Sequence, residues 1–120
     1  MSFHAPIPTL RILDEAKARE FYIDWLGFEI AFEHRFEPNT PLFMGIRKGD
    51  CYIHLSEHHG DGIPGQHVSI ECDELEDFHA SLKPYKYYRP GLQDQEWGHR
   101  EMCVQDGFGN RLIFFRKLKK

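Results

Sequence analysis

The feature that most constrains this chain is a repeat: each half contains an extended segment, an aspartate, an amphipathic helix pattern and a run of alternating segments. In the first half, Asp14 is followed by apolar residues at helical spacing, among them Phe21 and Leu26, and then by Gly27. Aspartate favours the position before a helix, and glycine favours the left-handed residue that ends one. The pattern predicts a helix over residues 15–26.

Alternation of apolar and polar residues on either side of this helix is typical of half-buried strands. Residues 7–12 should be extended, with Pro6 and Pro8 tolerable only near an exposed or interchain edge. Three more strands are expected, over residues 28–33, 42–46 and 51–56. The first half is therefore expected to run as one strand, one helix and three strands.

The same pattern restarts after a connection rich in glycine and proline at residues 57–65. Asp73 and Glu76 have the spacing of a capping box, which predicts a second helix over residues 74–83, ended by Pro84. Strands are expected around this helix, over residues 66–72, 85–88, 99–105 and 111–115.

The last two of these strands should form a hairpin. Met102 and Val104 alternate with polar neighbours, and residues 111–115 form an apolar strand. Asp106, two glycines and Asn110 between them supply turn chemistry. This turn is expected to set the register of the two strands.

Together these segments predict a single α+β domain of two βαβββ modules, residues 1–58 and 66–116. We expect the strands to form a curved, partly closed mixed sheet, with both helices on its convex face and a cavity on its concave face. A chain of 120 residues is long enough to bury roughly two-thirds of the surface that it exposes when unfolded.

Composition narrows the choice of partners. The net charge of −4, from 19 acidic and 15 basic residues, makes nucleic acid an unexpected partner. The sequence lacks both an apolar stretch of the ~20 residues that a membrane helix needs and a secretory pattern at its start, so we expect no membrane partner and a cytoplasmic location. Cys51, Cys72 and Cys103 are interpreted as reduced packing residues.

Two motifs resemble the glyoxalase/bleomycin-resistance/dioxygenase superfamily, also called the vicinal oxygen chelate group, and the resemblance covers nearly the whole chain. Its first helix commonly ends in "FY…LGF", and its bleomycin-resistance branch carries "WGxREF…DPxGN". The matching residues are Phe21-Tyr22 with Leu26-Gly27-Phe28, and Trp97-Gly98-His99-Arg100-Glu101-Met102 with Asp106-Gly107-Phe108-Gly109-Asn110. Gly107 replaces the usual proline and Phe108 a small or acidic residue, which predicts a looser or more apolar turn.

The resemblance also implies where a divalent metal would bind. Metal-dependent members use His and Glu from four strands, and the corresponding residues here are Ile7, His54, His67 and Ile113. Because such sites need three or four protein ligands, the two histidines alone would hold an ion weakly. We therefore expect no cofactor. The alternative is a metal-dependent lyase, isomerase or dioxygenase with a rearranged site of His54, His67 and Glu101.

Strand alternation identifies polar candidates for the cavity. His54 lies on the face of its strand opposite to that of Ile53 and Leu55. His67 likewise lies on the face opposite to that of Val68, so both histidines should point toward the concave face. The simpler interpretation is a hydrogen-bonding residue on the surface. Arg100 and Glu101 must face opposite ways, so that one pairs within the protein while the other meets the ligand.

Aromatic residues supply the other candidates. Trp97 is either a core or interface residue or a flat wall against which a planar ligand stacks, and the resemblance makes the two interpretations about equal. Phe36 could extend that wall. The predicted ligand-binding residues are Trp97, His54, His67, Tyr52, Phe43 and Glu101.

The resemblance implies a homodimer of the bleomycin-resistance type, and with the aromatic candidates above we expect it to sequester an aromatic or amphipathic small molecule without turnover. No motif for covalent catalysis or nucleotide binding is present. The crevice could be shared between subunits, and the first strand is a candidate for exchange between chains. A third hypothesis is a structural or partner-binding protein with a filled cavity.

Overall fold

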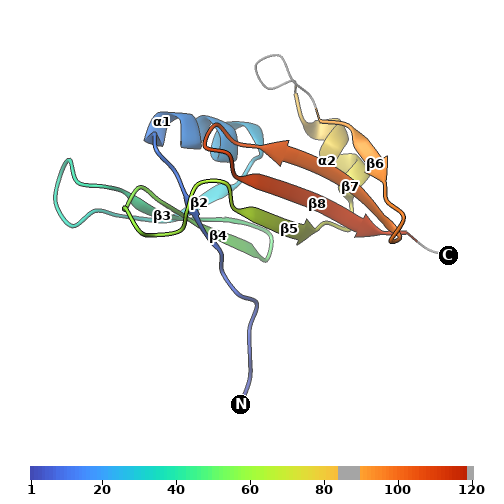
Figure 1. The fold of residues 1–120 in the computed structure, drawn as a ribbon, viewed down its shortest axis with the longest axis horizontal. Helices are drawn as coiled ribbons and strands as arrows, with labels where there is room; N and C mark the ends of the chain where they lie inside the picture. Colours follow the sequence, from blue (N-terminus) through green and yellow to red (C-terminus); the bar gives the residue numbers. More distant parts are fainter. Residues whose placement is uncertain (84–89, 119–120) are drawn as a thin grey trace.

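Each half of the chain forms a βαβββ unit, as Figure 1 shows. The computed structural model describes residues 1–83 and 90–118, so the predicted strand at 85–88 and the stop at Pro84 lie outside the described residues. The first half contains β1 (Thr9–Arg11), α1 (Glu15–Ala18), the π-helix η1 (Arg19–Trp25), β2 (Glu29–His34), β3 (Phe43–Lys48) and β4 (Cys51–Ser56). The second contains β5 (His67–Glu71), α2 (Leu75–Ser81), β6 (Leu92–Asp94), β7 (His99–Gln105) and β8 (Arg111–Lys117).

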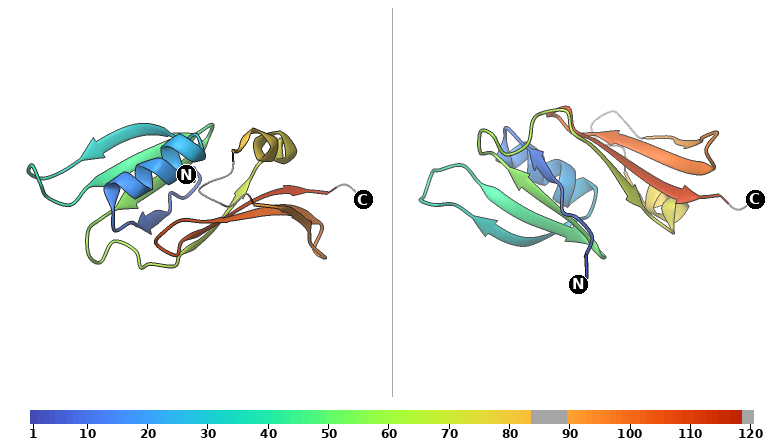
Figure 2. Two further views of the ribbon diagram at one scale, coloured as in Figure 1. Left: turned by 90° about the horizontal axis from the view of Figure 1, so that it is seen from above. Right: turned by 60° about the horizontal axis from the view of Figure 1, so that its bottom comes forward.

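The described strands form two four-stranded mixed sheets, ordered β1-β4-β3-β2 and β5-β8-β7-β6. In each sheet the first strand of the module runs parallel to the last, with Thr9 opposite His54 and His67 opposite Arg111, and the other pairs are antiparallel. The views in Figure 2 show the two sheets side by side, and neither is closed into a barrel. The predicted α+β class with duplicated modules is confirmed.

The first helix begins as the sequence predicts. The Asp14 carboxylate accepts a hydrogen bond of 2.9 Å from the backbone N–H of Lys17, and Gly27 takes the left-handed conformation with a φ of 82°. Both features satisfy backbone groups that a helix leaves open at its ends. The predicted helix over residues 15–26 is present as α1 and η1, which together span residues 15–25.

Its second part is a π-helix rather than the predicted α-helix. The N–H of Leu26 donates to the carbonyl of Phe21, five residues earlier, at 3.0 Å. Phe21 and the adjacent Tyr22 are both fully buried, with their rings in an edge-on contact at 4.9 Å. The wider turn thus accompanies the burial of two consecutive aromatic residues, which the regular helical spacing did not predict.

The predicted cap of the second helix is wrong. α2 begins after Glu74 rather than Asp73, and no side chain caps its first turn. The Glu76 carboxylate, expected in a capping box, instead accepts hydrogen bonds of 2.7 Å from both Arg100 and Arg116. Two guanidinium groups offer this carboxylate stronger hydrogen bonds than one backbone N–H would, so Glu76 binds α2 to β7 and β8.

One continuous core joins the two halves, because the apolar side chains between each helix and its sheet belong to the same buried cluster. The cluster includes Leu10, Ile12, Phe21, Tyr22, Met44, Ile46, Ile53 and Leu55 from the first half, and Leu75, Leu82, Met102, Val104, Leu112 and Phe114 from the second.

No described helix is long and apolar enough to cross a membrane.

The turn between β7 and β8 connects the modules through buried polar groups. The Tyr22 hydroxyl donates to the Asp106 carboxylate at 2.6 Å, and the Asn110 side-chain amide donates to the same carboxylate and to the Arg11 carbonyl at 2.9 and 2.8 Å. Burial and the neighbouring carboxylate raise the pKa of Tyr22, so it stays a hydrogen-bond donor. Phe108, also in this turn, packs against the core.

Replacing Asn110 by alanine should lower the free energy of unfolding by about 3 kcal/mol, because Asp106 and the Arg11 carbonyl would lose a buried donor. Urea denaturation would measure the change. The exposed Gln93→Ala on β6 is the control and should stay within about 0.5 kcal/mol of the wild type. An Asn110→Ala variant as stable as this control would contradict the proposed role of the turn.

The ion pairs of Glu76 predict a pH dependence. Hydrogen bonds from Arg116 and Arg100 lower the pKa of Glu76 from its ordinary value of 4.5 to about 2. A lowered pKa adds stability above the unfolded pKa and loses it as pH falls toward the folded value. The difference in melting temperature between wild type and Glu76→Gln should therefore shrink as pH falls from about 5 to about 2. The control is the exposed Glu71→Gln, measured in the same way. A melting-temperature difference between wild type and Glu76→Gln that stays constant with pH would refute the ion pairs of Glu76.

Candidate functional site

The first sheet has one covered face and one open face. The paired residues Leu10, Leu55 and Met44 point into the core and are buried. The side chains of Phe32, Phe43, Tyr52 and His54 lie on the other face, where no helix covers them, and we call them the first open face. Three of the six predicted ligand-binding residues, Phe43, Tyr52 and His54, are therefore together on one surface.

Three rings on this face contact one another. Phe32 lies 6.0 Å from Phe43 in a stacked arrangement, and His54 lies edge-on to Phe32 and Phe43 at 5.5 and 5.0 Å. The Phe32 ring occupies the space beside Gly45, where an added Cβ would come within 2.2 Å of Phe32 Cε2. A side chain at position 45 would therefore displace the Phe32 ring.

Phe32 reaches this face through a β-bulge that alternation did not predict. Simple alternation puts Ile30 and Phe32 on the same side of β2, but the register shifts between them. Ile30 consequently pairs with the buried Ile46, whereas Phe32 pairs with Gly45 on the open face. Sequence reasoning missed Phe32 as a site residue, and the glycine in the neighbouring strand was the only local signal.

The aromatic surface continues past the end of β2. His34 lies edge-on to Phe36 at 4.8 Å, and Phe36 lies edge-on to His58 at 5.9 Å. Phe36, predicted as further wall, is thus adjacent to the end of the strand that carries Phe32. The open surface of the first module combines aromatic rings with imidazoles, which can donate or accept hydrogen bonds.

The second sheet has a similar open face. The indole N–H of Trp97 donates to the Glu101 carboxylate at 3.1 Å, and His99 stacks on Phe115 at 4.4 Å with an angle of 14° between the rings. His67, the first residue of β5, lies on the same side of this sheet and pairs with Arg111 of β8. The second open face consists of His67, Trp97, His99, Glu101 and Phe115.

Arg100 and Glu101 face opposite ways, as predicted. Arg100 lies on the helix side of the second sheet, where its guanidinium binds Asp94 and Glu76. Glu101 lies on the open side, with His99 Nδ1 at 3.9 Å in addition to the indole of Trp97. One charge thus serves the internal packing and the other belongs to the open face.

The six predicted residues divide evenly between the two open faces of one chain. Tyr52 and His67 come together, since both line a cavity of about 790 Å³ that residues 4–8, Ile7 among them, also line. His54 is absent from that cavity and contacts Phe32 and Phe43 instead. Trp97 lies in the turn before β7 and Glu101 lies on β7, and neither residue lines this cavity.

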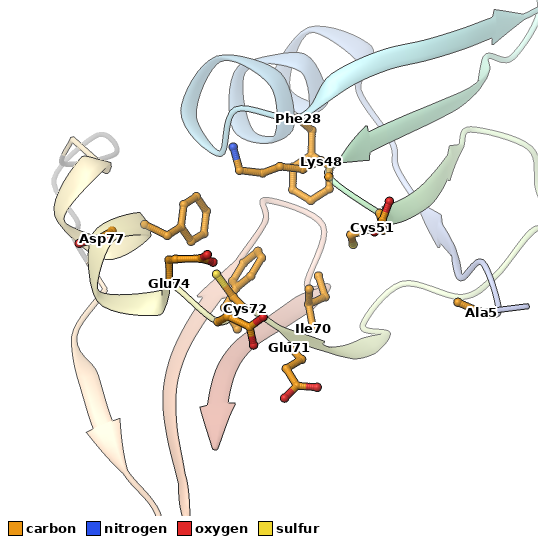
Figure 3. A pocket seen from close by; sticks show the side chains of 14 residues that line it. Ala5, Phe28, Lys48, Cys51, Ile70, Glu71, Cys72, Glu74 and Asp77 are labelled. Atoms are coloured by element: carbon orange, nitrogen blue, oxygen red, sulfur yellow. The ribbon is translucent and has the colours of Figure 1, made fainter. Parts of the chain in front are cut away.

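A further cavity, of about 1000 Å³, lies between the modules on the helix side, as shown in Figure 3. Phe28, Phe78 and Phe114 form its apolar wall, and none of the six predicted residues lines it. Burial raises the pKa of both Cys51 and Cys72, which line this cavity as neutral thiols. These two cysteines and Cys103 are reduced, as predicted, but Cys103 is exposed and is not a packing residue.

The positions that correspond to metal ligands do not fit a metal site. Ile7 and Ile113 have no donor atoms, and both lie on the open side of the sheets rather than beneath the helices. Within residues 1–83 and 90–118, no group of three His, Cys, Asp or Glu side chains could hold a metal ion. We therefore derive no step through a metal.

The fold and the order of its motifs agree with a known family. The family described as "Glyoxalase superfamily protein" matches residues 1–120. The chain belongs to this family. Among its curated relatives, the "Bleomycin resistance protein" of Geobacillus stearothermophilus is 26% identical over 133 residues, covering 94% of this chain and 96% of the relative. A protein of the same name from Staphylococcus aureus matches to the same extent.

Solved structures share the fold of this family member. A bleomycin-binding protein complexed with bleomycin has a TM-score of 0.72 at 22% identity, covering 96% of this chain and 99% of the other. The bleomycin resistance determinant of transposon Tn5 has a TM-score of 0.70 at 19% identity, covering 96% and 98%. An antibiotic binding protein from Streptomyces sp. CB03234 has a TM-score of 0.69 at 14% identity, covering 98% of both chains.

Proposed function

We propose that the protein binds and sequesters an aromatic or amphipathic small molecule, in the manner of bleomycin resistance proteins and without metal-dependent turnover. The observation that carries this proposal is the aromatic composition of the two open faces. Tyr52 is 44% exposed, Phe32 42% and Trp97 65%, although aromatic side chains of this size are mostly buried in folded proteins. Gathered apolar side chains on a surface mark binding sites.

The geometry of the open faces suits a flat ligand. Phe32, Phe43 and His54 form one aromatic wall, and Trp97 with its hydrogen bond to Glu101 forms part of another. A planar ring stacked on such walls gains contact area together with about 0.5–1.5 kcal/mol for each favourable aromatic pair. His54, His67 and Glu101 would set the orientation of the ligand through its polar groups.

The relatives support this chemistry. Two curated relatives are named for bleomycin resistance, and a protein of the same fold binds bleomycin. Bleomycin is therefore the first compound to try. The net charge of −4 also favours a cationic ligand. Sequestration needs no catalytic group, because binding alone lowers the concentration of free compound.

A homodimer is part of the proposal. In one chain both open faces are uncovered, whereas a second copy placed against them would enclose a crevice with walls from two subunits. The N-terminal segment projects from the body in Figure 1, with Phe3 90% exposed, and is a candidate for exchange between the chains. A cytoplasmic location also stays a prediction, and three cysteines in the reduced form suit a reducing compartment.

Titration with bleomycin tests the binding proposal directly. We expect calorimetry to detect binding. The ligand should also quench the fluorescence of the exposed Trp97. Phe43→Ala and Trp97→Ala should each weaken the affinity about three- to tenfold, because each removes one stacking surface. Phe78→Leu is the matched control, since Phe78 contacts Phe114 on the helix side of the second sheet. A chelator should leave the affinity unchanged.

Two results would contradict this proposal. The first is an affinity that neither open-face variant changes. The second is a library of planar aromatic compounds, bleomycin included, in which none raises the melting temperature. A ligand at a hundred times its dissociation constant should add about 2.7 kcal/mol to the free energy of unfolding. A flat response would favour a structural protein with a filled cavity.

Light scattering coupled to gel filtration tests the dimer. The mass should be about twice the 14.2 kDa of one chain, because both open faces need a cover. Removing the projecting residues 1–6 should weaken the dimer if the segment is exchanged. A monomer at concentrations where bleomycin binds would show that one chain is sufficient for binding and would refute the shared crevice.

A further inference from the structure

Arg11 differs from the other half-buried arginines of the described chain because no carboxylate pairs with it. Its Nε atom is buried and has no hydrogen-bond partner, and Arg111, which also forms no ion pair among the described residues, is exposed. In contrast, five other arginines in the described part of the chain bind carboxylates: the half-buried Arg19, Arg35, Arg100 and Arg116, and the exposed Arg47. A buried guanidinium donor without an acceptor is unfavourable, and in an acidic chain it is unexpected.

A carboxylate at this corner of the first sheet already has a hydrogen-bond partner. Arg11 lies opposite Ser56 in the register of β1 and β4. The Ser56 hydroxyl donates to the Asp61 carboxylate at 2.9 Å, so Asp61 binds the serine rather than the arginine. Asp61 therefore lies at this corner of the sheet without forming an ion pair with Arg11 among the described residues.

Arg11 lines a cavity of about 750 Å³ between β1 and the loop at residues 57–66. Gly62 holds this loop directly against β1, because an added Cβ would lie 2.9 Å from the Thr9 carbonyl oxygen and its φ of 77° is left-handed. The wall therefore has a defined position. The cavity is lined by Arg11, Leu13, His59, Ile63, Pro64 and Gln66, with two glycines of the loop.

We propose that this cavity binds the carboxylate of a small organic acid. The guanidinium presents parallel N–H groups that match the two oxygens of a carboxylate, and the Gln66 amide can donate a further hydrogen bond. Leu13 and Ile63 are 59% and 69% exposed at the same cavity, so an apolar body attached to the acid would cover hydrocarbon.

The site is separate from the open faces proposed for sequestration. Its lining includes none of Phe43, Tyr52, His54, His67, Trp97 or Glu101. The inference therefore does not depend on the proposed function. The cavity offers one guanidinium and no lysine, and its other walls are largely apolar, which favours an organic monocarboxylate over inorganic phosphate.

Benzoate is a suitable probe for the full chain, with neutral benzamide of the same shape as its partner. We expect benzoate, and not benzamide, to shift the backbone amide resonances of residues 59–66 in a saturable titration. Arg11→Gln should weaken benzoate at least about tenfold, and Arg11→Lys should bind with intermediate affinity because it keeps the charge without the fork. The control is Arg47→Gln, which removes an exposed arginine near the end of β3 that does not line the cavity. This variant should bind benzoate like the wild type.

The titration of the wild type also tests the proposal without any variant. Absence of saturable shifts at residues 59–66, or shifts confined to the open faces, would overturn it. Equal binding of benzamide would remove the role of the carboxylate, and phosphate that binds as tightly as benzoate would remove the role of the apolar walls. Arg11→Gln that folds normally and binds benzoate unchanged would exclude Arg11 as the binding residue.

Discussion

The buried contact between the β7–β8 turn and the first module determines how the rest of the structure is arranged. Asp106 and Asn110 lie in the second module, yet their partners include Tyr22 in η1 and the carbonyl of Arg11 in β1. Since unpaired buried polar groups are costly, these groups accept few relative positions of the modules. These hydrogen bonds therefore fix the position of one open face relative to the other, while the shared core supplies most of the buried apolar surface.

Local sequence signals predicted the elements well wherever one interaction determined the structure. The Asp14 cap, the left-handed Gly27 and the alternation in β4 and β7 depend on neighbours in the chain, and each is present. Predictions failed where a distant group competed. Glu76 was expected to cap α2, but Arg100 and Arg116 bind it from the second sheet. A capping box is visible in the sequence, whereas the two arginines that override it lie 24 and 40 residues away.

The candidate site shows the same limit on a larger scale. Alternation placed His54 and His67 on the open sides of their strands, which the sheet registers bear out. It did not reveal that His54 packs against Phe32, because the bulge in β2 reverses the facing of one residue. Nor does a period of two residues say which faces of two separate sheets meet. That question depends on packing between modules or between chains.

The exposure of the open faces also links ligand binding to assembly. An aromatic wall left in water loses the stabilisation that burial would give, so any partner that covers it, a ligand or a second chain, is favoured by the same surface. If both contribute to one crevice, ligand binding must stabilise the dimer by the free energy that dimerisation adds to ligand binding. Apparent affinity would then rise with protein concentration until the dimer is fully formed. Measurements at a single protein concentration would mix the two equilibria, whereas a concentration series separates the stacking contribution of Phe43 and Trp97 from that of assembly.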